Sequence, residues 1–262
     1  MEHDGGRATI ASLRRYLEEL RETGVDGLPF ATEALRTAAV SESGEVLATA
    51  CSTVIPSTPL PVVPEAGAAP DPVSETLDAI RNELGECQRC QLGASRTSLV
   101  YGVGSPRARL VFVGEAPGRD EDLRGEPFVG EAGQLLTKII QAMGYARDEV
   151  YICNVLKCRP PGNRNPHPEE IEQCAPFMLR QVKAIGPVVV VALGTFAAQT
   201  LLGSKEPISK LRGRFHDYHG IPLMPTFHPS FLLRNPAMKR EVWEDMKQVM
   251  KKLGKDVPSI KE

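Results

Sequence analysis

The fold class of this chain is decided by the stretch Pro187-Val188-Val189-Val190-Val191-Ala192-Leu193-Gly194-Thr195. Its centre is a run of apolar, mostly β-branched side chains without polar alternation, so a strand formed here is apolar on both faces. Strands of this kind occur where helices cover a parallel sheet on each side. The stretch therefore predicts an α/β domain.

Similar patterns flank this strand in both directions. Strands are predicted over residues 109–113, 150–154, 187–193 and 221–225. Helices predicted over residues 74–83, 131–143, 168–185, 195–202 and 239–253 alternate with them. We therefore expect a three-layer α/β/α architecture of roughly 190 residues around a central, mostly parallel four-stranded sheet.

The first 73 residues have a different character. One face of a charged helical period over residues 9–23 carries Ile10, Leu13, Leu17 and Leu20. Between residues 52 and 73 lie six prolines, a composition that stays extended and forms no core. We divide the chain into an acidic extension with one amphipathic helix (1–50), a Pro-rich linker (51–73) and a globular domain (74–262). The helix is expected to dock on its own domain, to self-associate, or to bind a protein partner.

The composition is that of a soluble globular protein, with 42% hydrophobic and 24% charged residues. Neither a membrane-spanning run nor a secretory signal is visible, so we expect a cytoplasmic protein that makes no membrane contact. The net charge of −2 is unevenly distributed: residues 1–75 carry 5 basic and 12 acidic side chains, which leaves a surplus of five positive charges for the remainder. That surplus is compatible with a nucleic-acid ligand or with a small anionic substrate.

Six cysteines in a cytoplasmic chain are expected to stay reduced, so an organised subset of them indicates metal binding. Such a subset is formed by Cys87, Cys90, Cys158 and Cys174. Four thiolates can hold a structural zinc or an iron–sulfur cluster, and the wide spacing of the second pair favours the cluster. Zinc and unrelated buried cysteines remain alternatives. We expect Cys51 and Cys153 to take no part.

Three motifs near predicted strand ends carry a resemblance to a known family. They are Gly114-Glu115-Ala116-Pro117-Gly118-Arg119-Asp120-Glu121-Asp122, Asn154-Val155-Leu156-Lys157-Cys158-Arg159-Pro160-Pro161-Gly162-Asn163-Arg164, and His228-Pro229-Ser230-Phe231-Leu232-Leu233. With the four cysteines in order, this part of the chain, about residues 76–255, resembles the type-4 (iron–sulfur) uracil-DNA glycosylases. The resemblance implies one 4Fe-4S cluster, a catalytic domain over 74–262, and hydrolytic release of uracil from DNA for base-excision repair.

The resemblance also implies a pocket for a flipped-out uracil. Its expected members are Gly114, Glu115, Ala116, Glu121, Phe128, Asn154 and His228. Phe128 can stack on the base, and the Asn154 amide offers the donor and acceptor that match uracil O4 and N3–H. Glu121 is expected to wall off the C5 position of the base.

The expected catalytic residues are His228, Glu115 and Asn154. A neutral His228 and the backbone N–H groups of the 114–118 turn can donate to the negative charge that develops on uracil O2. Other glycosylases of the superfamily carry a water-activating Asp at the position of Ala116, so the general base is open, with Glu115 its first candidate and Glu121 its second.

Expected DNA contacts are Lys157, Arg159, Arg164, Leu232 and Arg234. The basic residues can contact phosphates, and one of Phe231, Leu232 and Leu233 can act as the wedge that replaces the flipped base.

The expected partner is uracil-containing DNA, single- or double-stranded, bound by a monomer. One alternative function is a relative that traps uracil-DNA without turnover, although the short loop from Pro160 to Pro168 disfavours it. An iron–sulfur redox protein and a non-catalytic nucleic-acid-binding module are further alternatives. The redox reading leaves Asn154, Phe128 and His228 without roles.

Overall fold

The computed structural model describes residues 75–257, so the predicted N-terminal helix and the whole predicted linker, including Cys51, lie outside the described residues. A six-stranded sheet with the order β1-β3-β2-β4-β6-β5 forms its centre. Its strands are β1 (Val103–Gly104), β2 (Leu110–Gly114), β3 (Tyr151–Asn154), β4 (Val189–Leu193), β5 (His216–Tyr218) and β6 (Ile221–Thr226). The four predicted strands form its parallel centre. The predicted total of four was wrong, because the short β1 and β5 add antiparallel edges.

All five predicted helices are present within three residues of their predicted ends. The α-helices are α2 (Leu77–Leu84), α3 (Leu92–Ser95), α4 (Arg119–Arg124), α5 (Glu131–Ala142), α6 (Pro168–Ile185), α7 (Thr195–Leu202), α8 (Ile208–Leu211), α9 (Pro229–Arg234) and α10 (Lys239–Lys252). Two short 3-10 turns, Pro161–Asn163 and Pro236–Met238, complete the described elements. None of the helices in residues 75–257 has the length and apolar character needed to cross a bilayer.

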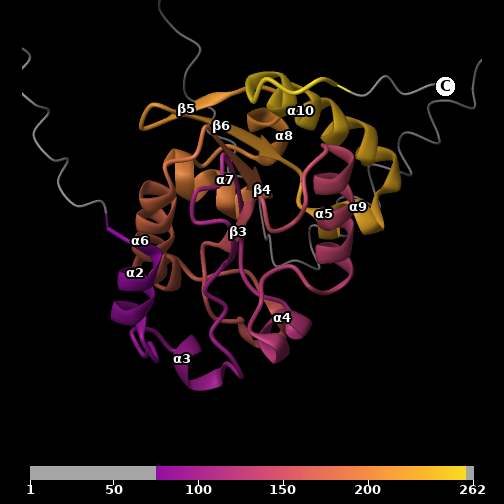
Figure 1. Cartoon of the computed structure of the whole chain (residues 1–262). Helices are drawn as coiled ribbons and strands as arrows, with labels where there is room; N and C mark the ends of the chain where they lie inside the picture. The colour runs from indigo at the N-terminus through magenta and orange to yellow at the C-terminus, as the bar shows by residue number, and fades with distance from the viewer. Residues whose placement is uncertain (1–74, 258–262) are drawn as a thin grey trace, which may run out of the picture. The chain divides into compact units, whose positions relative to one another are not determined.

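The sheet separates two apolar layers, as the two-faced strands predict. Helices α2 and α6 lie on one side of the sheet, and α5, α9 and α10 lie on the other (Figure 1). Val111 and Val113 of β2 pack toward the α6 side, whereas Leu110 and Phe112 pack toward the α5 and α10 side. The alternation of one strand between two cores confirms the three-layer α/β/α arrangement.

The strand register brings the carboxyl ends of the parallel strands together. Gly114 at the end of β2 pairs with Asn154 at the end of β3, and Leu193 of β4 pairs with Thr226 of β6. The chain leaves β2 toward β3 and returns across it to β4, so the direction of winding reverses at β2. Ligands of open α/β sheets bind at the carboxyl edge beside such a reversal. Three of the sequence motifs meet at this edge.

Candidate active site

Gly114 provides a flat surface on which two of the predicted pocket residues lie. A Cβ added to Gly114 would come 2.3 Å from Asn154 Oδ1 and 2.5 Å from Phe128 Cζ. No side chain fits there, because both neighbours would have to move. Hydrogen bonds from Val155 N–H to Gly114 O and from Leu156 N–H to Glu115 O join the first motif to the second. The two motifs therefore build one wall of a shared pocket.

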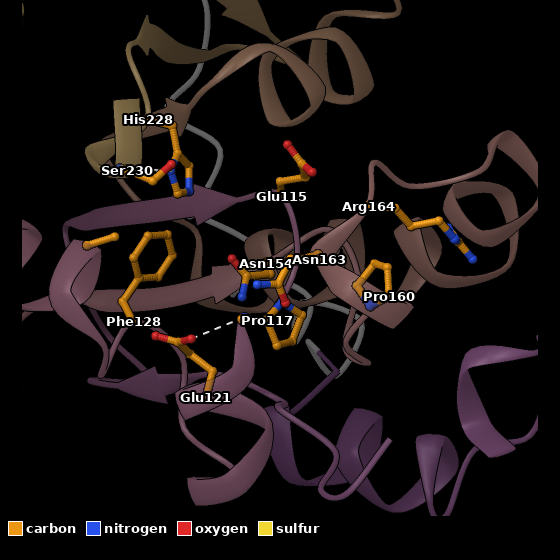
Figure 2. A pocket seen from close by; sticks show the side chains of 13 residues that line it. Glu115, Pro117, Glu121, Phe128, Asn154, Pro160, Asn163, Arg164, His228 and Ser230 are labelled. Carbon is orange, nitrogen blue, oxygen red and sulfur yellow. Dashed lines mark hydrogen bonds between the residues drawn. The ribbon is translucent and has the colours of Figure 1, made fainter. Parts of the chain in front are cut away.

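Asn154 and Phe128 present a polar edge and an apolar face to that pocket. Asn154 is 1% exposed, and its Oδ1 is buried without a hydrogen-bond partner within residues 75–257. Phe128 is buried beside it, and its ring centroid lies 5.6 Å from that of His228. Figure 2 shows these three side chains around one cavity. An unpaired buried acceptor is costly, so this site is complementary to a ligand that donates a hydrogen bond.

His228 is held in a defined tautomer. It caps the N-terminus of α9, where its Nδ1 accepts the N–H of Ser230 at 3.2 Å and lies 2.8 Å from Ser230 Oγ. Because Nδ1 accepts, the proton of the neutral ring belongs on Nε2. Burial, aided by the charge of Arg234, lowers the pKa of His228 to about 4. The ring is thus a neutral hydrogen-bond donor at physiological pH.

Gly194 lies against His228 and leaves room for its side chain. Its backbone has a φ of +89°, and an added Cβ would lie 3.1 Å from His228 Cβ. Below the histidine, Thr226 Oγ1 donates to Asp245 Oδ2 at 2.6 Å, and Arg212 pairs with the same carboxylate at 2.9 Å. These contacts fix the end of β6 against α10.

Glu115 stands between two adjacent cavities, both of which are also bordered by Ala116 and His228. Burial raises the pKa of Glu115 to about 7. Carboxyl groups with a pKa near the working pH can exchange protons during a reaction. The Ala116 methyl, in contrast, offers no polar group.

The structure gives Glu121 a bracing contact that the sequence did not predict. Its Oε2 accepts the N–H of Gly118 at 3.1 Å, and its Oε1 accepts the N–H groups of Val129 and Gly130 at 2.8 and 2.9 Å. Gly118 N–H is therefore engaged by Glu121. Pro117 has no N–H. Of the backbone donors expected from the 114–118 turn, only those of residues 114–116, nearest the end of β2, are therefore left for a ligand.

Two of the residues expected to contact DNA have buried side chains in this structure. Lys157 is 1% exposed, and its Nζ donates to Asn154 O at 2.9 Å and to Gln181 Oε1 at 2.5 Å. Leu232 is 1% exposed in the core under α9. Of the other two wedge candidates, Leu233 is 41% exposed and Phe231 is half-buried beside the second cavity, so Leu233 is the most exposed of the three.

The three remaining basic residues differ in their surroundings. Arg234 is exposed beside the second cavity. Arg159 Nε donates to Asn163 Oδ1 at 2.7 Å. Arg164 borders the first cavity but pairs with Glu170 at 2.6 Å, and its guanidinium is turned away from Asn154 and Phe128 (Figure 2). Of these three arginines, Arg234 is the one that is exposed and makes no hydrogen bond from its guanidinium within residues 75–257.

Several residues that border this cavity were not named individually as pocket members in the sequence analysis, although two of them belong to the 114–118 turn expected to supply backbone donors. They are Pro117, Gly118, Ala132, Pro160, Asn163 and Ser230. The His-Pro-Ser order, typical of a capped helix start, could have identified Ser230 as the partner of His228. Asn163 and Pro160 belong to a loop whose path no periodicity predicts.

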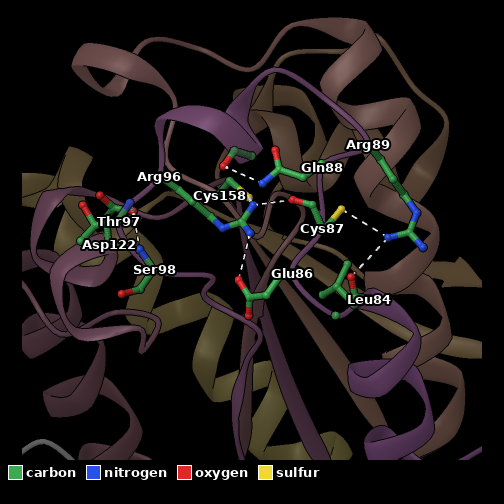
Figure 3. A network of polar contacts seen from close by, with 12 residues as sticks. Leu84, Glu86, Cys87, Gln88, Arg89, Arg96, Thr97, Ser98, Asp122 and Cys158 are labelled. Carbon is green, nitrogen blue, oxygen red and sulfur yellow. Dashed lines mark hydrogen bonds and ion pairs between the residues drawn. The ribbon is translucent and has the colours of Figure 1, made fainter.

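The four predicted metal-binding cysteines border one small cavity. Its walls include Cys87, Cys90, Cys158 and Cys174, together with Leu84 and Phe177. N–H groups surround the sulfur atoms: Arg89 lies 3.3 Å from Cys87 Sγ, Arg96 lies 3.5 Å from Cys158 Sγ, and the Lys157 amide lies 3.2 Å from Cys174 Sγ. Figure 3 shows the two arginines around Cys87 and Cys158. Cys153 is a buried residue of β3 and does not border this cavity.

The donor set suits negatively charged sulfur atoms. Burial raises the pKa of the Cys174 thiol to about 11, so this side chain keeps its proton unless a cation replaces it. Hydrogen bonds to sulfur are a common feature around iron–sulfur clusters. No group of three or more His, Cys, Asp or Glu side chains in residues 75–257 meets the geometry for holding a metal ion as the residues stand.

Comparison with known proteins identifies the class of this fold and site. The family model of the uracil DNA glycosylase superfamily matches residues 101–247. A type-4 uracil-DNA glycosylase of Archaeoglobus fulgidus is 44% identical over 194 residues, which cover 71% of this chain and 98% of that protein. Another of Thermotoga maritima is 45% identical over 70% of this chain and 97% of its own length. A third, of Saccharolobus solfataricus, is 39% identical over 69% of this chain and 88% of its own.

The chain belongs to the type-4 uracil-DNA glycosylases, an iron–sulfur family within that superfamily.

Proposed function

We propose that this protein removes uracil from DNA by hydrolysing the N-glycosidic bond, leaving an abasic site for base-excision repair. The observation that carries the proposal is the buried, unpaired Oδ1 of Asn154 beside the Phe128 ring, with the His228 imidazole across the same cavity. This arrangement offers an acceptor for a base edge, an apolar face for stacking and a donor for a leaving group. A base can reach it only after leaving the helical stack.

Selection of uracil follows from the Asn154 side chain. Its Oδ1 accepts N3–H of uracil while its amide N–H₂ donates to O4. Cytosine presents the opposite pair, an unprotonated N3 and an N4–H₂ donor. Both polar contacts would then be unpaired in a buried site, so cytosine binds poorly. The Phe128 ring adds stacking that any flat base can use.

Bond cleavage leaves an electron-poor sugar and a uracil anion. The bond between C1′ and N1 breaks with its electron pair moving onto uracil, and the charge spreads to O2. His228, protonated on Nε2, donates to that oxygen, which is the most effective place for a fixed donor. A neutral histidine suffices because the role is hydrogen bonding rather than proton transfer.

Water completes the reaction by adding its oxygen to C1′. Glu115 faces this region from between the two cavities, whereas Ala116 offers no base. We assign Glu115 the orientation of the water and the acceptance of its proton. Its role is smaller than that of His228 if the sugar has developed much positive charge before water attacks.

The four cysteines Cys87, Cys90, Cys158 and Cys174, which border the small cavity beside Leu84 and Phe177, would hold one 4Fe-4S cluster. Bound there, the cluster supplies cross-linking of distant segments: the 87–90 knuckle, the loop after β3 and helix α6. Arg89 and Arg96 would neutralise part of its negative charge through the contacts described above. This role is structural, and the proposed hydrolysis passes no electron through it.

DNA is expected to lie across the carboxyl edge of the sheet. Arg234 supplies a phosphate contact, and Leu233 on the same helix supplies the wedge into the space left by the flipped base. Arg159 and Arg164 contribute charge nearby. Every residue given a role here lies between Cys87 and Arg234, and we propose that 74–262 carries the chemistry as a monomer.

The test is an excision assay on single-stranded DNA with one uracil, with hot alkali used to cut abasic sites. It is run with the full chain and with a chain that begins at residue 74. We expect cleavage with many turnovers from both and none on a cytosine control. A stoichiometric, alkali-stable adduct would indicate the trapping relative, and intact DNA would refute the proposed function. Activity of the full chain alone would refute the domain division.

A further inference from the structure

Phe128 has an unusual backbone conformation for an aromatic residue. Its φ is +54°, one of three positive values among the non-glycine residues of 75–257. Side chains with a Cβ rarely adopt this region, and such strain persists only where surrounding contacts enforce it. The contacts that enforce it here are therefore part of the pocket.

Arg147 donates hydrogen bonds to the two main-chain carbonyls that flank the Phe128 φ angle. Its Nη2 donates to Pro127 O at 2.6 Å and to Phe128 O at 3.0 Å, and its Nη1 donates to Thr137 Oγ1 at 3.1 Å. Arg147 lies in the loop between α5 and β3, about twenty residues after Phe128 and at the far end of α5. One guanidinium thus ties two successive carbonyls to the helix.

The next two residues are held from the opposite direction. The Glu121 carboxylate accepts the N–H groups of Val129 and Gly130 through one oxygen. Arg147 donates to residues 127 and 128, and Glu121 accepts from 129 and 130. The backbone from 127 to 130 is therefore held by two side chains of opposite charge: the Arg147 cation donates to its carbonyls, and the Glu121 carboxylate accepts from its N–H groups.

Helix α5 closes the third side. A Cβ on Gly133 would lie 1.9 Å from the carbonyl carbon of Phe128, so the strained backbone presses directly on the helix. Thr137 Oγ1, which accepts from Arg147, donates to Gly133 O at 3.0 Å. Arg147, Thr137 and Gly133 thus form one connected support beneath Phe128.

We propose that Arg147 is a positioning residue that holds the Phe128 ring in the orientation needed to stack on uracil. This inference rests on the proposed function, because it assigns a purpose to the ring. Arg147 itself does not border the pocket. Its removal would release two carbonyls and let Phe128 relax toward negative φ, which moves the ring away from Gly114 and Asn154.

The first test observes the ring without any reaction. The full chain is labelled with 4-fluorophenylalanine, and the signal of Phe128 among the eight phenylalanines is assigned by its loss in Phe128→Leu. In Arg147→Met we expect this ¹⁹F signal to shift or to split. Arg107→Met is the matched control, because Arg107 is exposed, lies before the amino end of β2 and makes no side-chain hydrogen bond within residues 75–257. An unchanged Phe128 signal in Arg147→Met would overturn the proposal.

The second test is a double-mutant cycle on single-turnover excision. Arg147→Met should slow excision at least about tenfold in the wild-type background and have little effect in Phe128→Leu. Equal losses in both backgrounds would show that Arg147 does not act through Phe128. If Arg147→Met does not fold, Arg147→Lys is measured in the same two ways, with smaller changes of the same kind expected. Inactivity of the wild-type protein would refute the proposed function, and the ¹⁹F result would still decide the positioning.

Discussion

Lys157 donates a 2.9 Å hydrogen bond from its Nζ to the main-chain carbonyl of Asn154. The same residue donates its main-chain N–H to Cys174 Sγ at 3.2 Å. One buried residue therefore connects the side chain that reads the base to the cavity bordered by four cysteines. These two hydrogen bonds account for the inward direction of the Lys157 side chain, which the sequence analysis expected to contact phosphate.

Salt dependence of DNA binding separates the buried lysine from the exposed arginine. Arg234→Gln should lower the slope of log K against log salt by about 0.7 to 0.9, the loss of one phosphate contact. Lys157→Met should leave the slope unchanged while reducing excision, because Asn154 O loses its donor. Titrations by fluorescence anisotropy at several salt concentrations measure the slope for both variants, and the excision assay measures the rate. A lower slope in Lys157→Met would contradict the assignment of this residue to the interior.

Metal content and colour report on the cysteine set. Anaerobically purified protein should be brown, with broad visible absorption from iron and acid-labile sulfide. Cys158→Ala and Cys174→Ala should lose this absorption and lower the midpoint of thermal unfolding, whereas Cys51→Ala should change neither. Stoichiometric zinc without sulfide would rule out the cluster. Equal damage from Cys51→Ala would show that the wrong four residues were chosen.

Asn154 is tested by exchanging its amide for a carboxylate. Asn154→Asp replaces the donor to uracil O4 with an oxygen, so excision of uracil should fall on the order of a hundredfold. Weak excision of cytosine is expected from this variant if the new acid is protonated, and none from Asn154→Ala. Asn82→Asp, the same exchange at an exposed position of α2, is the control. Unchanged uracil excision by Asn154→Asp would remove this residue from base recognition.

Glu115 gives the reaction and the fold opposite dependences on pH. With a pKa of about 7, its carboxylate becomes abundant only above that pH. Single-turnover excision should therefore rise between pH 6 and 8, and Glu115→Gln should make the profile flat. If Glu115→Gln slows single-turnover excision as much as His228→Ala does, the Glu115 carboxylate is essential. A decrease of less than about tenfold would indicate that Glu115 only positions the water.

Stability should change in the other direction. A carboxyl group whose pKa is raised by folding binds its proton more tightly in the folded protein. The free energy of unfolding therefore falls as pH rises from the pKa of the unfolded chain, 4.5, to the folded pKa of about 7. The midpoint of thermal unfolding of Glu115→Gln relative to the wild type should therefore be higher at pH 8 than at pH 4. A difference independent of pH would contradict the raised pKa.

The sequence predicted the parallel centre of the sheet because each of its strands contains a mostly apolar run of four to six residues, which is richest in β-branched side chains in β4. It missed β1 and β5 because two- and three-residue edge strands such as His216–Tyr218 show no usable periodicity. Asn154, Glu115 and His228 border one cavity because they lie at or just after the carboxyl ends of parallel strands, whereas Phe128 and Glu121 were named only through the family resemblance.

The direction of individual side chains was harder to predict. Lys157 and Arg159 are two residues apart in one loop, yet one is buried and the other is not. Leu232 is buried and Leu233 is exposed because these adjacent residues lie on different faces of α9. Arg147 had no sequence signal, because its partners are two main-chain carbonyls and one threonine hydroxyl, ten to twenty residues away along the chain. Such contacts depend on tertiary structure alone.

The most direct test of the central claim is the single-turnover rate of His228→Ala. If His228 stabilises the departing uracil anion through Nε2–H, the variant should bind uracil-DNA nearly as well as the wild type but react about a hundredfold or more slowly. Ser230→Ala, which removes one of two contacts to Nδ1, should lose less. A wild-type rate for His228→Ala, measured on fully bound DNA, would contradict the account.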